Sequence, residues 1–333
     1  MKELLLYLFE HRTLSRERAK EALLAIGEGK YNEHELSAFM SVFLMRNITL
    51  EEMAGFKDAL LELCVKINFG ATQSIDIVGT GGDGRNTFNI STITCFIVAA
   101  AGQPVTKHGS FGSSSVSGAS NFMSALGYQF KTDPSLLANE LAETNLCFLH
   151  APIFHPALKT VAPIRKNLRV RTVFNLLGPL VNPAEPAFQM IGAYNIEIVR
   201  MYNYLLQSEN RKYAIVHSMD GYDEVSLTSE VKVVSHKEEK MISPSAFSSV
   251  AVNHASLFGG ESEEQAAKIG YAILMGEGTQ QQNAVVIANA ALALMTAERY
   301  NDLPTALEAA ADALHSGKVK QTMNRLIQLQ SKL

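Results

Sequence analysis

Residues 74–92 read SIDIVGTGGDGRNTFNIST, and this stretch decides how the fold of the whole chain is interpreted. Residues 75–78 are a short, mostly β-branched run that predicts a strand, and four glycines follow within residues 79–84. Glycine lets the backbone turn sharply and bring its N–H groups against a bulky anion. Polar side chains then precede an apolar helical pattern over residues 93–101, so the positive dipole end of that helix faces the loop. The stretch therefore predicts a strand, an anion-binding loop and a helix, suited to phosphate or pyrophosphate.

The spacing of the glycines argues against two common nucleotide-binding loops. No Gly-Lys-Ser/Thr sequence closes the loop as in a Walker motif, and the glycines do not follow the dinucleotide pattern Gly-x-Gly-x-x-Gly. The glycines alone leave open a purely structural loop closed by an Asx-type turn at Asp83. Lys107 follows the next predicted strand, residues 104–106, and favours anion binding; its alternative is a lysine that snorkels at a strand end.

Composition indicates a globular protein with reduced cysteines. The 333 residues are 47% apolar, which is ample for a buried core, and the formal net charge is −4. No run of lysine or arginine reaches the density expected for nucleic-acid or membrane-surface binding, so we expect neither partner. Cys64, Cys95 and Cys147 lie at unpatterned positions in apolar surroundings, which predicts buried thiols. The N-terminus lacks a signal-peptide pattern, and the longest apolar stretch, 284–295, is too short to span a bilayer, so we expect a cytoplasmic protein.

The first part of the chain has a helical pattern throughout. Residues 2–67 carry apolar positions at helical spacing, with helix-start signals at Ser15, Asn32 and Thr49. Some of the apolar residues exceed what a short bundle needs for its own core. These residues include Leu36, Phe39, Met40, Phe43, Leu44 and Met45. They predict either a partner surface or packing against the rest of the same chain.

From residue 75 onward, β-branched runs alternate with helical patterns, which predicts a parallel sheet with crossover helices. Further strands are expected at 190–194, 214–217 and 231–234, and further helices at 121–126, 263–275, 280–299 and 302–333 with a break near Gly317. The proline-rich stretch 156–182 has the character of a crossing between lobes. We therefore expect an α/β protein with a small all-helical domain and a larger domain whose mainly parallel sheet is flanked by helices. The expected boundaries are 1–70, joined by part of 158–185, for the helical domain, and 71–157 with 186–333 for the α/β domain.

Eight motifs, in order along most of the chain, resemble anthranilate phosphoribosyltransferases. They are residues 79–83, 89–92, 107–109, 117–118, 155–156, 161–166, 171–180 and 220–224. The resemblance implies a nucleoside phosphorylase/phosphoribosyltransferase-like fold and a homodimer formed through the helical domain. It also implies transfer of a phosphoribosyl group from phosphoribosyl pyrophosphate to anthranilate, with magnesium, in tryptophan biosynthesis.

The resemblance implies a phosphoribosyl pyrophosphate site made of the glycine loop, the helix start and a second loop that begins at Lys107. Its residues are Gly79, Gly82, Asp83, Thr87, Asn89, Ser91, Thr92, Lys107, Ser113, Ser114, Ser115 and Ala119. Displacing pyrophosphate makes the sugar positive and the leaving group negative, so the site must neutralise phosphate oxygens and hold a weakly basic amine. Little proton chemistry is required, and no residue is assigned as a catalytic acid or base.

Two adjacent acids, Asp223 and Glu224, lie in a turn after the strand that ends at His217. Carboxylates near a pyrophosphate suit Mg²⁺, which takes few protein oxygens and completes its shell with water and phosphate. The resemblance associates this pair and the hydroxyl of Ser91 with the metal. Without the resemblance, a solvated acidic loop is the simpler interpretation.

The resemblance matches Arg165 to the arginine that faces the anthranilate carboxylate, and a guanidinium is well shaped to pair with a planar carboxylate. It places further residues near anthranilate. These are Gly79, His108, Ser110, His155 and Pro179. A histidine beside glycine or proline is often a hydrogen-bonded structural residue. His108 and His155 are therefore placed near anthranilate without a catalytic role.

Three positions depart from the family pattern. Ser110 stands where asparagine contacts anthranilate, and serine lacks the amide that offers two donors. Ala119 replaces a serine that contacts the phosphoribosyl group, and Asn121 replaces an aspartate. One lost hydroxyl contact is worth roughly 0.5–1.5 kcal/mol, too little to abolish a site with many donors. The departures therefore bear on the acceptor more than on the donor.

Two other functions remain as alternatives. A related transferase or phosphorylase could use another aromatic or nucleobase acceptor, which Ser110 favours and Arg165 disfavours. A non-catalytic relative could bind nucleic acid, but this needs a basic groove, and the acidic balance with Asp223 and Glu224 argues against it.

Overall fold

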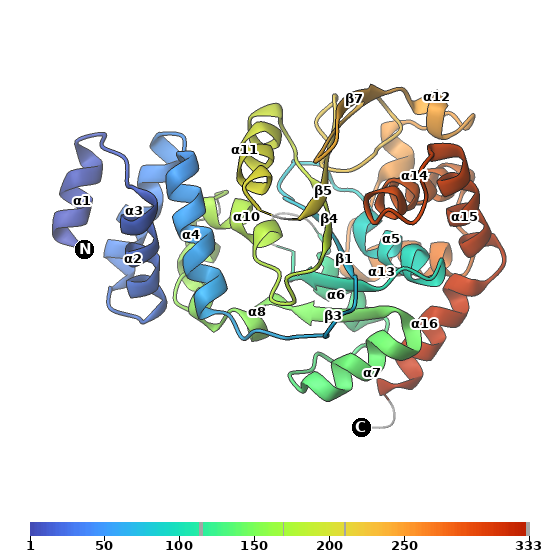
Figure 1. The fold of residues 1–333 in the computed structure, drawn as a ribbon, viewed down its shortest axis with the longest axis horizontal. Helices are drawn as coiled ribbons and strands as arrows, with labels where there is room; N and C mark the ends of the chain where they lie inside the picture. The colour runs from blue at the N-terminus through green and yellow to red at the C-terminus, as the bar shows by residue number, and fades with distance from the viewer. Residues whose placement is uncertain (113–115, 169, 210, 331–333) are drawn as a thin grey trace. The chain divides into compact units, whose positions relative to one another are not determined.

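The computed structural model describes residues 1–112, 116–168, 170–209 and 211–330. The chain divides into two units (Figure 1). The helical unit contains residues 1–67 and 151–185, and the α/β unit contains residues 68–150 and the chain from 186 onward. Residues 151–157, which we expected in the α/β domain, belong to the helical unit. The short helix at 156–159 packs on the second and fourth helices of this unit, and the short helix at 151–154 packs on it in turn.

The helical unit begins with four helices, and local side chains cap the starts of three of them. Its elements are α1 (Lys2–Phe9), α2 (Arg16–Gly27), α3 (Glu33–Met45), α4 (Leu50–Leu63), α8 (Ala151–Phe154), η1 (Pro156–Lys159), α9 (Ala162–Leu168), α10 (Val173–Leu177) and η2 (Gly178–Leu180). Ser15 caps α2, and Asn32 and Thr49 form capping boxes at the starts of α3 and α4. All three predicted helix starts are confirmed.

The apolar surplus of the helical unit is divided between its core and its surface. Phe39, Phe43 and Phe56 pack edge to face with ring centroids 5.1–5.9 Å apart. Leu44 and Met45 at the end of α3 stay exposed, Met45 to 86%. Most of the surplus is therefore core, and the part left for a partner is small.

The α/β unit is built on a seven-stranded sheet with the order β3-β2-β1-β4-β5-β6-β7. Its strands are β1 (Ile75–Gly79), β2 (Val105–Gly109), β3 (Leu146–His150), β4 (Phe188–Gly192), β5 (Lys212–Ser218), β6 (Val231–Ser235) and β7 (Glu239–Ile242). The five strands from β3 to β5 are parallel, and β6 and β7 are antiparallel. The mainly parallel sheet is confirmed, so the carboxyl ends of its central strands meet at one edge.

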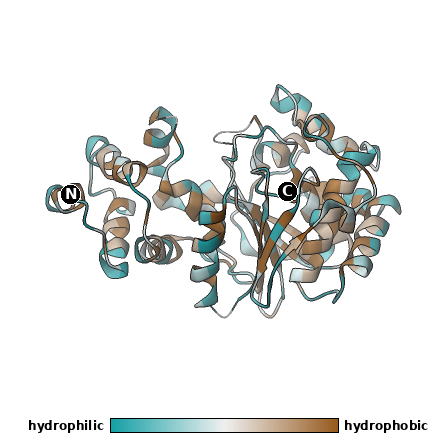
Figure 2. Cartoon of the chain, turned by 90° about the horizontal axis from the view of Figure 1, so that it is seen from above, coloured by the Kyte–Doolittle hydropathy of each residue, from teal (hydrophilic) through white to brown (hydrophobic). Residues whose placement is uncertain are grey.

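Helices cover the sheet and complete the core. They are α5 (Ile90–Ala100), α6 (Ala119–Ala125), α7 (Pro134–Thr144), α11 (Ile196–Gln207), α12 (Pro244–Phe247), η3 (His254–Leu257), α13 (Glu263–Leu274), α14 (Gln280–Thr296), α15 (Leu303–His315) and α16 (Lys318–Gln328). Helix α11 lies on one side of the sheet and α5 and α14 lie on the other (Figure 1). Hydrophobic residues concentrate in the strands and in the helices beside them (Figure 2). Within the described residues, no helix is both long and apolar enough to cross a membrane.

The cysteines are free thiols, but they are not all buried as predicted. Cys95 in α5 and Cys147 in β3 are buried, and burial raises the pKa of Cys95 to about 12. Cys64, which follows α4, is only partly buried because it lies at the end of its helix.

Candidate active site

The glycine loop leaves the end of β1 in a conformation that only glycine adopts easily. Gly81, Gly82 and Gly84 have φ values of +62°, +73° and +76°. The side chain of Asp83 accepts a hydrogen bond from the backbone N–H of Arg85 at 2.9 Å, so the Asx-type turn is present. The loop is thus a fixed turn.

The acidic turn fits directly against this loop. The Asp223 carboxylate accepts hydrogen bonds from the Gly81 N–H at 2.7 Å and from the Thr80 hydroxyl at 3.4 Å. Gly79 and Gly192 are paired on the neighbouring strands β1 and β4. A Cβ at Gly79 would lie 2.4 Å from Asp223 Oδ2, and one at Gly192 would lie 1.5 Å from the Asp223 carbonyl oxygen. Both glycines therefore make room for Asp223.

The amino end of α5 receives the second acid of the turn. The helix begins at Ile90, three residues earlier than predicted, and the side chain of its N-cap residue, Asn89, does not cap it. The Ser91 N–H donates instead to Glu224 Oε1 at 3.0 Å, which matches a carboxylate to the positive end of the helix. The Asn89 amide exchanges hydrogen bonds with Ser117 in the second loop. Thr92 is buried within the first turn of α5.

Lys107 brings a positive charge to the same strand edge. Its ammonium donates to the Ile77 carbonyl and lies 3.4 Å from the Ser91 hydroxyl. The side chain is only 2% exposed, so it does not snorkel into solvent. The next residue, His108, donates its backbone N–H to Asp76, a buried carboxylate on β1 that the sequence interpretation missed.

Asp223 and Glu224 are two buried carboxyl groups close to each other and to Asp83. Burial raises the pKa of Asp223, and burial together with the neighbouring charges of Asp223 and Asp83 raises the pKa of Glu224 well above its usual value. The Lys107 ammonium opposes both shifts but does not cancel them. A divalent cation would relieve this charge, and the Ser91 hydroxyl lies beside it. Across the described part of the chain, no group of three or more His, Cys, Asp or Glu side chains forms a metal cage, so a cation here would need ligands from a substrate or water.

The second loop folds back on the start of α6. The Ser110 carbonyl accepts the Ser120 N–H at 3.0 Å, and the Asn121 side-chain oxygen accepts the N–H groups of Gly112 and Gly118 at 2.9 and 3.0 Å. Asn121 thereby supplies the acceptor oxygen that an aspartate would supply. The Ser110 side chain is exposed, and Ala119 is the first residue of α6. The predicted residues Ser113, Ser114 and Ser115 lie outside the described residues.

Two residues that the sequence interpretation did not assign hold the acidic turn. Asn289 of α14 exchanges hydrogen bonds of 3.1 and 2.9 Å with the backbone of Val225, and the Ser218 hydroxyl donates to the Glu224 carbonyl at 2.7 Å. Asn289 interrupts the apolar stretch 284–295 of α14, and a buried amide in such a place must find partners. This break in the apolar pattern was the sequence signal that could have identified Asn289.

The helical unit carries the other predicted residues. Its Arg165, on α9, has its guanidinium carbon 5.9 Å from the centroid of the Phe174 ring, and burial lowers the pKa of Arg165. Among the residues that the structure describes, no carboxylate lies within ion-pair distance of Arg165. His155 is 1% exposed and donates from Nε2 to the Val181 carbonyl at 2.8 Å, and Pro179 is buried in η2.

The structure thus gathers the glycine loop, Lys107, Ser91, Asp223 and Glu224 within the α/β unit. Thr87, at the exit of the loop, pairs with Phe258. His155, Arg165 and Pro179 belong to the helical unit.

Comparison with known proteins gives one consistent result. Residues 2–64 match the helical bundle domain of a glycosyl transferase family, and residues 71–320 match the a/b domain of the same family. The chain is 47% identical over 329 residues, 99% of each chain, to anthranilate phosphoribosyltransferase of Flavobacterium psychrophilum. The crystal structure of the Thermus thermophilus anthranilate phosphoribosyltransferase has a TM-score of 0.90 and 29% identity, covering 98% of this chain and 99% of that one. The Saccharomyces cerevisiae enzyme in complex with PRPP and Mg has a TM-score of 0.88 and 27% identity, covering 96% and 94%. Identity of 47% over almost the full length of such an enzyme, together with the two family matches, shows that the chain belongs to the anthranilate phosphoribosyltransferase family.

Proposed function

We propose that this protein transfers the phosphoribosyl group of phosphoribosyl pyrophosphate to anthranilate, giving N-(5-phosphoribosyl)anthranilate and pyrophosphate in tryptophan biosynthesis. The observation that carries the proposal is the convergence of the glycine loop, the Lys107 ammonium and the carboxylates of Asp223 and Glu224 at one strand edge. Family membership supports it, since the relatives named above are anthranilate phosphoribosyltransferases.

The proposed donor site works by neutralising the charge of the leaving group. The bond from the anomeric carbon to pyrophosphate breaks with its electron pair on pyrophosphate, and the anthranilate nitrogen forms the new bond to that carbon. Backbone N–H groups of the glycine loop, the amino end of α5 and the Lys107 ammonium stabilise the developing negative charge. The amine releases its proton without a dedicated base, and we assign none.

Magnesium fits the residues present. Asp223 and Glu224 are adjacent carboxylates whose pKa values are raised by burial. The Ser91 hydroxyl lies 3.4 Å from the Lys107 ammonium, and the backbone N–H of the same serine donates to Glu224. These three residues would hold Mg²⁺, which supplies further positive charge to phosphate oxygens. The yeast neighbour, solved with PRPP and Mg, supports this assignment.

We propose that phosphoribosyl pyrophosphate contacts the residues that the sequence predicted. The turn made by the glycine loop supports this proposal. Gly82, Asp83, Thr87 and Asn89 lie along the loop and its exit. Gly79 is best explained by the space that Asp223 needs. Thr92 is buried, so its contribution is to the first turn of α5.

Arg165 is the proposed partner of the acceptor carboxylate. It is a partly buried guanidinium beside an aromatic ring, an environment that suits a benzoate. His108, Ser110 and Pro179 are proposed neighbours of anthranilate. The burial and hydrogen bond of His155 favour a structural role near that group.

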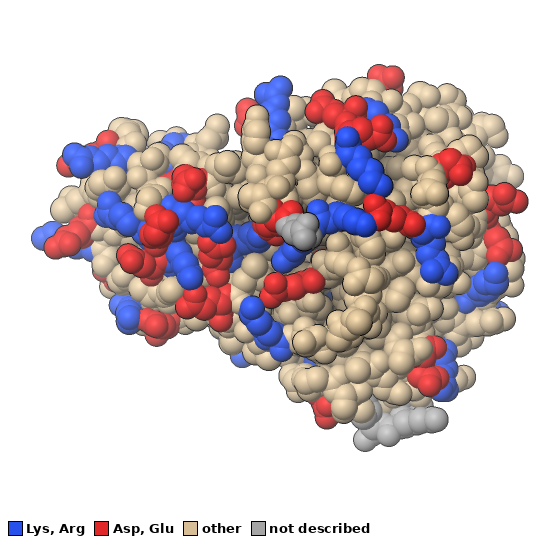
Figure 3. All heavy atoms as spheres, in the orientation of Figure 1, with Lys and Arg blue, Asp and Glu red and all other residues tan. Residues whose placement is uncertain are grey.

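Ser110 is the residue that favours an acceptor other than anthranilate. Its short side chain is exposed at the end of β2, where the family has asparagine, so another aromatic or nucleobase acceptor is the alternative. A nucleic-acid-binding role has less support, because acidic and basic side chains are interspersed on the face drawn in Figure 3.

The deciding experiment follows anthranilate fluorescence with phosphoribosyl pyrophosphate and magnesium, in parallel with substituted benzoates and nucleobases. We expect rapid consumption of anthranilate and no turnover of nucleobases. Turnover of a nucleobase with anthranilate untouched would contradict the proposal and favour the alternative.

We also propose that the protein is a homodimer formed through its helical unit. Leu6 and Phe9 on α1 and Leu44 and Met45 on α3 are exposed apolar side chains. Leu6 and Phe9 are three residues apart and share one helix face. These exposed apolar side chains support a partner surface on α1 and α3.

A further inference from the structure

The exit of the glycine loop is paired with a distant segment that the function above does not use. We name residues 254–260 the clamp segment. The Phe88 N–H donates to the Leu257 carbonyl at 3.1 Å, and the Gly259 N–H donates to the Asn86 carbonyl at 2.7 Å. A Cβ at Gly259 would lie 2.4 Å from the Thr87 carbonyl oxygen, so close backbone pairing requires glycine there. The clamp segment therefore fixes one end of the glycine loop.

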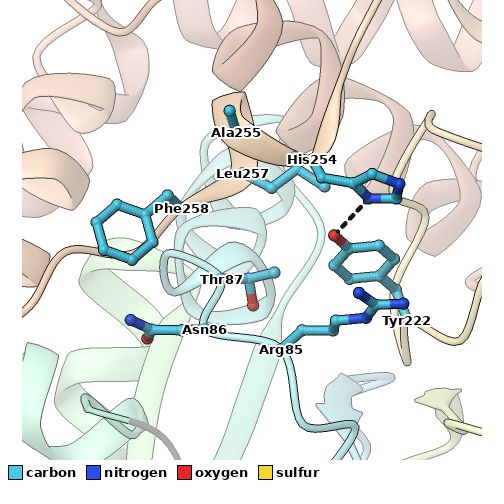
Figure 4. Close-up of a pocket in the computed structure, with 8 residues that line it drawn as sticks. All are labelled: Arg85, Asn86, Thr87, Tyr222, His254, Ala255, Leu257 and Phe258. Carbon is cyan, nitrogen blue, oxygen red and sulfur yellow. Dashed lines mark hydrogen bonds between the residues drawn. The ribbon is translucent and has the colours of Figure 1, made fainter.

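The same segment also holds the acidic turn. The Tyr222 hydroxyl and His254 Nδ1 are 2.9 Å apart, and the two rings are stacked at 5.8 Å between centroids with an interplanar angle of 16° (Figure 4). Tyr222 immediately precedes Asp223, and the ring carries the Arg85 guanidinium over its face at 4.9 Å. Arg85 itself donates to the Asp220 carbonyl at 2.8 Å. Glycine loop, acidic turn and clamp segment thus meet at Tyr222.

These contacts surround a cavity of about 460 Å³, lined on one side by the loop exit and on another by Tyr222 and His254 (Figure 4). Tyr222 is only 3% exposed and belongs to the hydrophobic core of the α/β unit. At the edge of the cavity its hydroxyl and one ring face meet His254 and Arg85, which add orientation to that packing. Tyr222 thus links the acidic turn to the clamp segment through His254 and to the exit of the glycine loop through Arg85.

We propose that Tyr222, held by His254, is a positioning residue that sets the acidic pair against the glycine loop for the magnesium complex of phosphoribosyl pyrophosphate. The proposal rests on the proposed function, since it assigns a role within the same site. Tyr222 touches neither substrate in this account and acts through Asp223 and Glu224.

Tyr222→Phe removes the bond to His254 and keeps the ring beneath Arg85. We expect the Michaelis constant for phosphoribosyl pyrophosphate and the half-saturating magnesium concentration to rise about three- to tenfold. This is the change that the loss of one hydrogen bond produces. The Michaelis constant for anthranilate stays unchanged. A second readout, the rise in melting temperature produced by magnesium pyrophosphate, is smaller in the variant at equal ligand concentration.

Tyr213→Phe is the matched control, because it removes a tyrosine hydroxyl bond of 2.7 Å to Asn203 elsewhere in the same unit. It should lower stability without moving either magnesium readout. His254→Phe removes the Tyr222 bond from the other side, keeps a stacked ring and must reproduce the shift.

Two results overturn the proposal: unchanged donor and magnesium constants in both Tyr222→Phe and His254→Phe, or an equal shift in Tyr213→Phe. Absence of turnover and of any pyrophosphate effect in the unmodified protein would instead contradict the proposed function, so the two failures are distinguishable.

Discussion

Arg165 is a partly buried cation, and within the described residues no carboxylate is close enough to pair with it. If it binds the acceptor carboxylate, Arg165→Ala should raise the Michaelis constant for anthranilate about 10- to 100-fold, since a hydrogen bond to a charged group is worth about 1.5–3 kcal/mol. The constant for phosphoribosyl pyrophosphate should change little. Steady-state kinetics with each substrate varied in turn measures both values.

Lys166→Ala is the control for that experiment, because it removes an exposed cation from the next position of α9. It should leave both constants near those of the unmodified protein. Equal increases for the two substrates in Arg165→Ala would show that Arg165 supports the fold and does not read the acceptor.

His155 makes stability depend on pH in a direction that its burial fixes. Burial lowers its pKa from 6.5 to about 4, so the folded protein holds the neutral ring. Stability from this group is complete above pH 6.5 and falls as pH drops toward 4, by about 2–3 kcal/mol at pH 4.5. Urea unfolding of the unmodified protein and of His155→Gln at pH 7 and pH 4.5 measures the difference. His150, whose pKa burial also lowers to about 4, is present in both proteins and cancels. The same loss on acidification in both would contradict this assignment.

In the helical unit, the start of α4 contains a buried ion pair. Glu52 is fully buried and accepts hydrogen bonds from Arg46, Thr49 and Leu14, which join α4 to the chain before α2 and to the end of α3. Burial raises the pKa of Glu52, but these donors outweigh it, and the net pKa is lowered. The carboxylate therefore stays charged and dependent on Arg46.

Arg46→Met should lower the free energy of unfolding by about 3 kcal/mol, because it leaves a buried carboxylate without its cation. Arg16→Met is the comparison, since the Arg16 pair with Asp58 has the same two-bond geometry but is largely exposed and should cost under about 1 kcal/mol. Urea denaturation followed by circular dichroism gives both values. Equal losses would mean that burial does not decide the strength of these pairs.

The elements also show what the sequence could and could not predict. Ser15, Asn32 and Thr49 act on residues two or three positions away, so their helix starts were readable from local sequence. The start of α5 was placed three residues late because the group that binds its N–H, Glu224, lies 133 residues further along the chain. Strands β3 and β7 were missed: β3 is a short, fully buried run next to a helix, and β7 is a polar edge strand with little alternation.

The residues of the site divide in the same way as the helix starts. The glycine loop, Lys107 and the acidic pair were found by motif, since each motif is continuous in sequence. Asp76, Asn289 and the clamp segment were not, because their contacts are tertiary and their residue types carry no motif.

For the whole molecule, the proposed homodimer depends on side chains that are exposed in one chain. Met45→Glu should produce monomers in analytical ultracentrifugation while the fold is retained, because Met45 is 86% exposed and a charge there opposes only association. Phe43, which the sequence grouped with Met45, is unsuitable because it packs against Phe39 and Phe56. Tyr204→Glu, at another exposed position on α11, is the control and should leave the dimer intact. A dimer that survives Met45→Glu would place the interface elsewhere.

Glycine-loop amides, the Lys107 ammonium and a cation held by Asp223 and Glu224 together form the proposed site for a diphosphorylated sugar. Isothermal titration calorimetry of phosphoribosyl pyrophosphate into the folded protein measures binding at this site. We expect saturable binding at one site per chain with magnesium and much weaker binding when the metal is chelated. No heat of binding in magnesium, from protein that circular dichroism shows to be folded, would contradict the account.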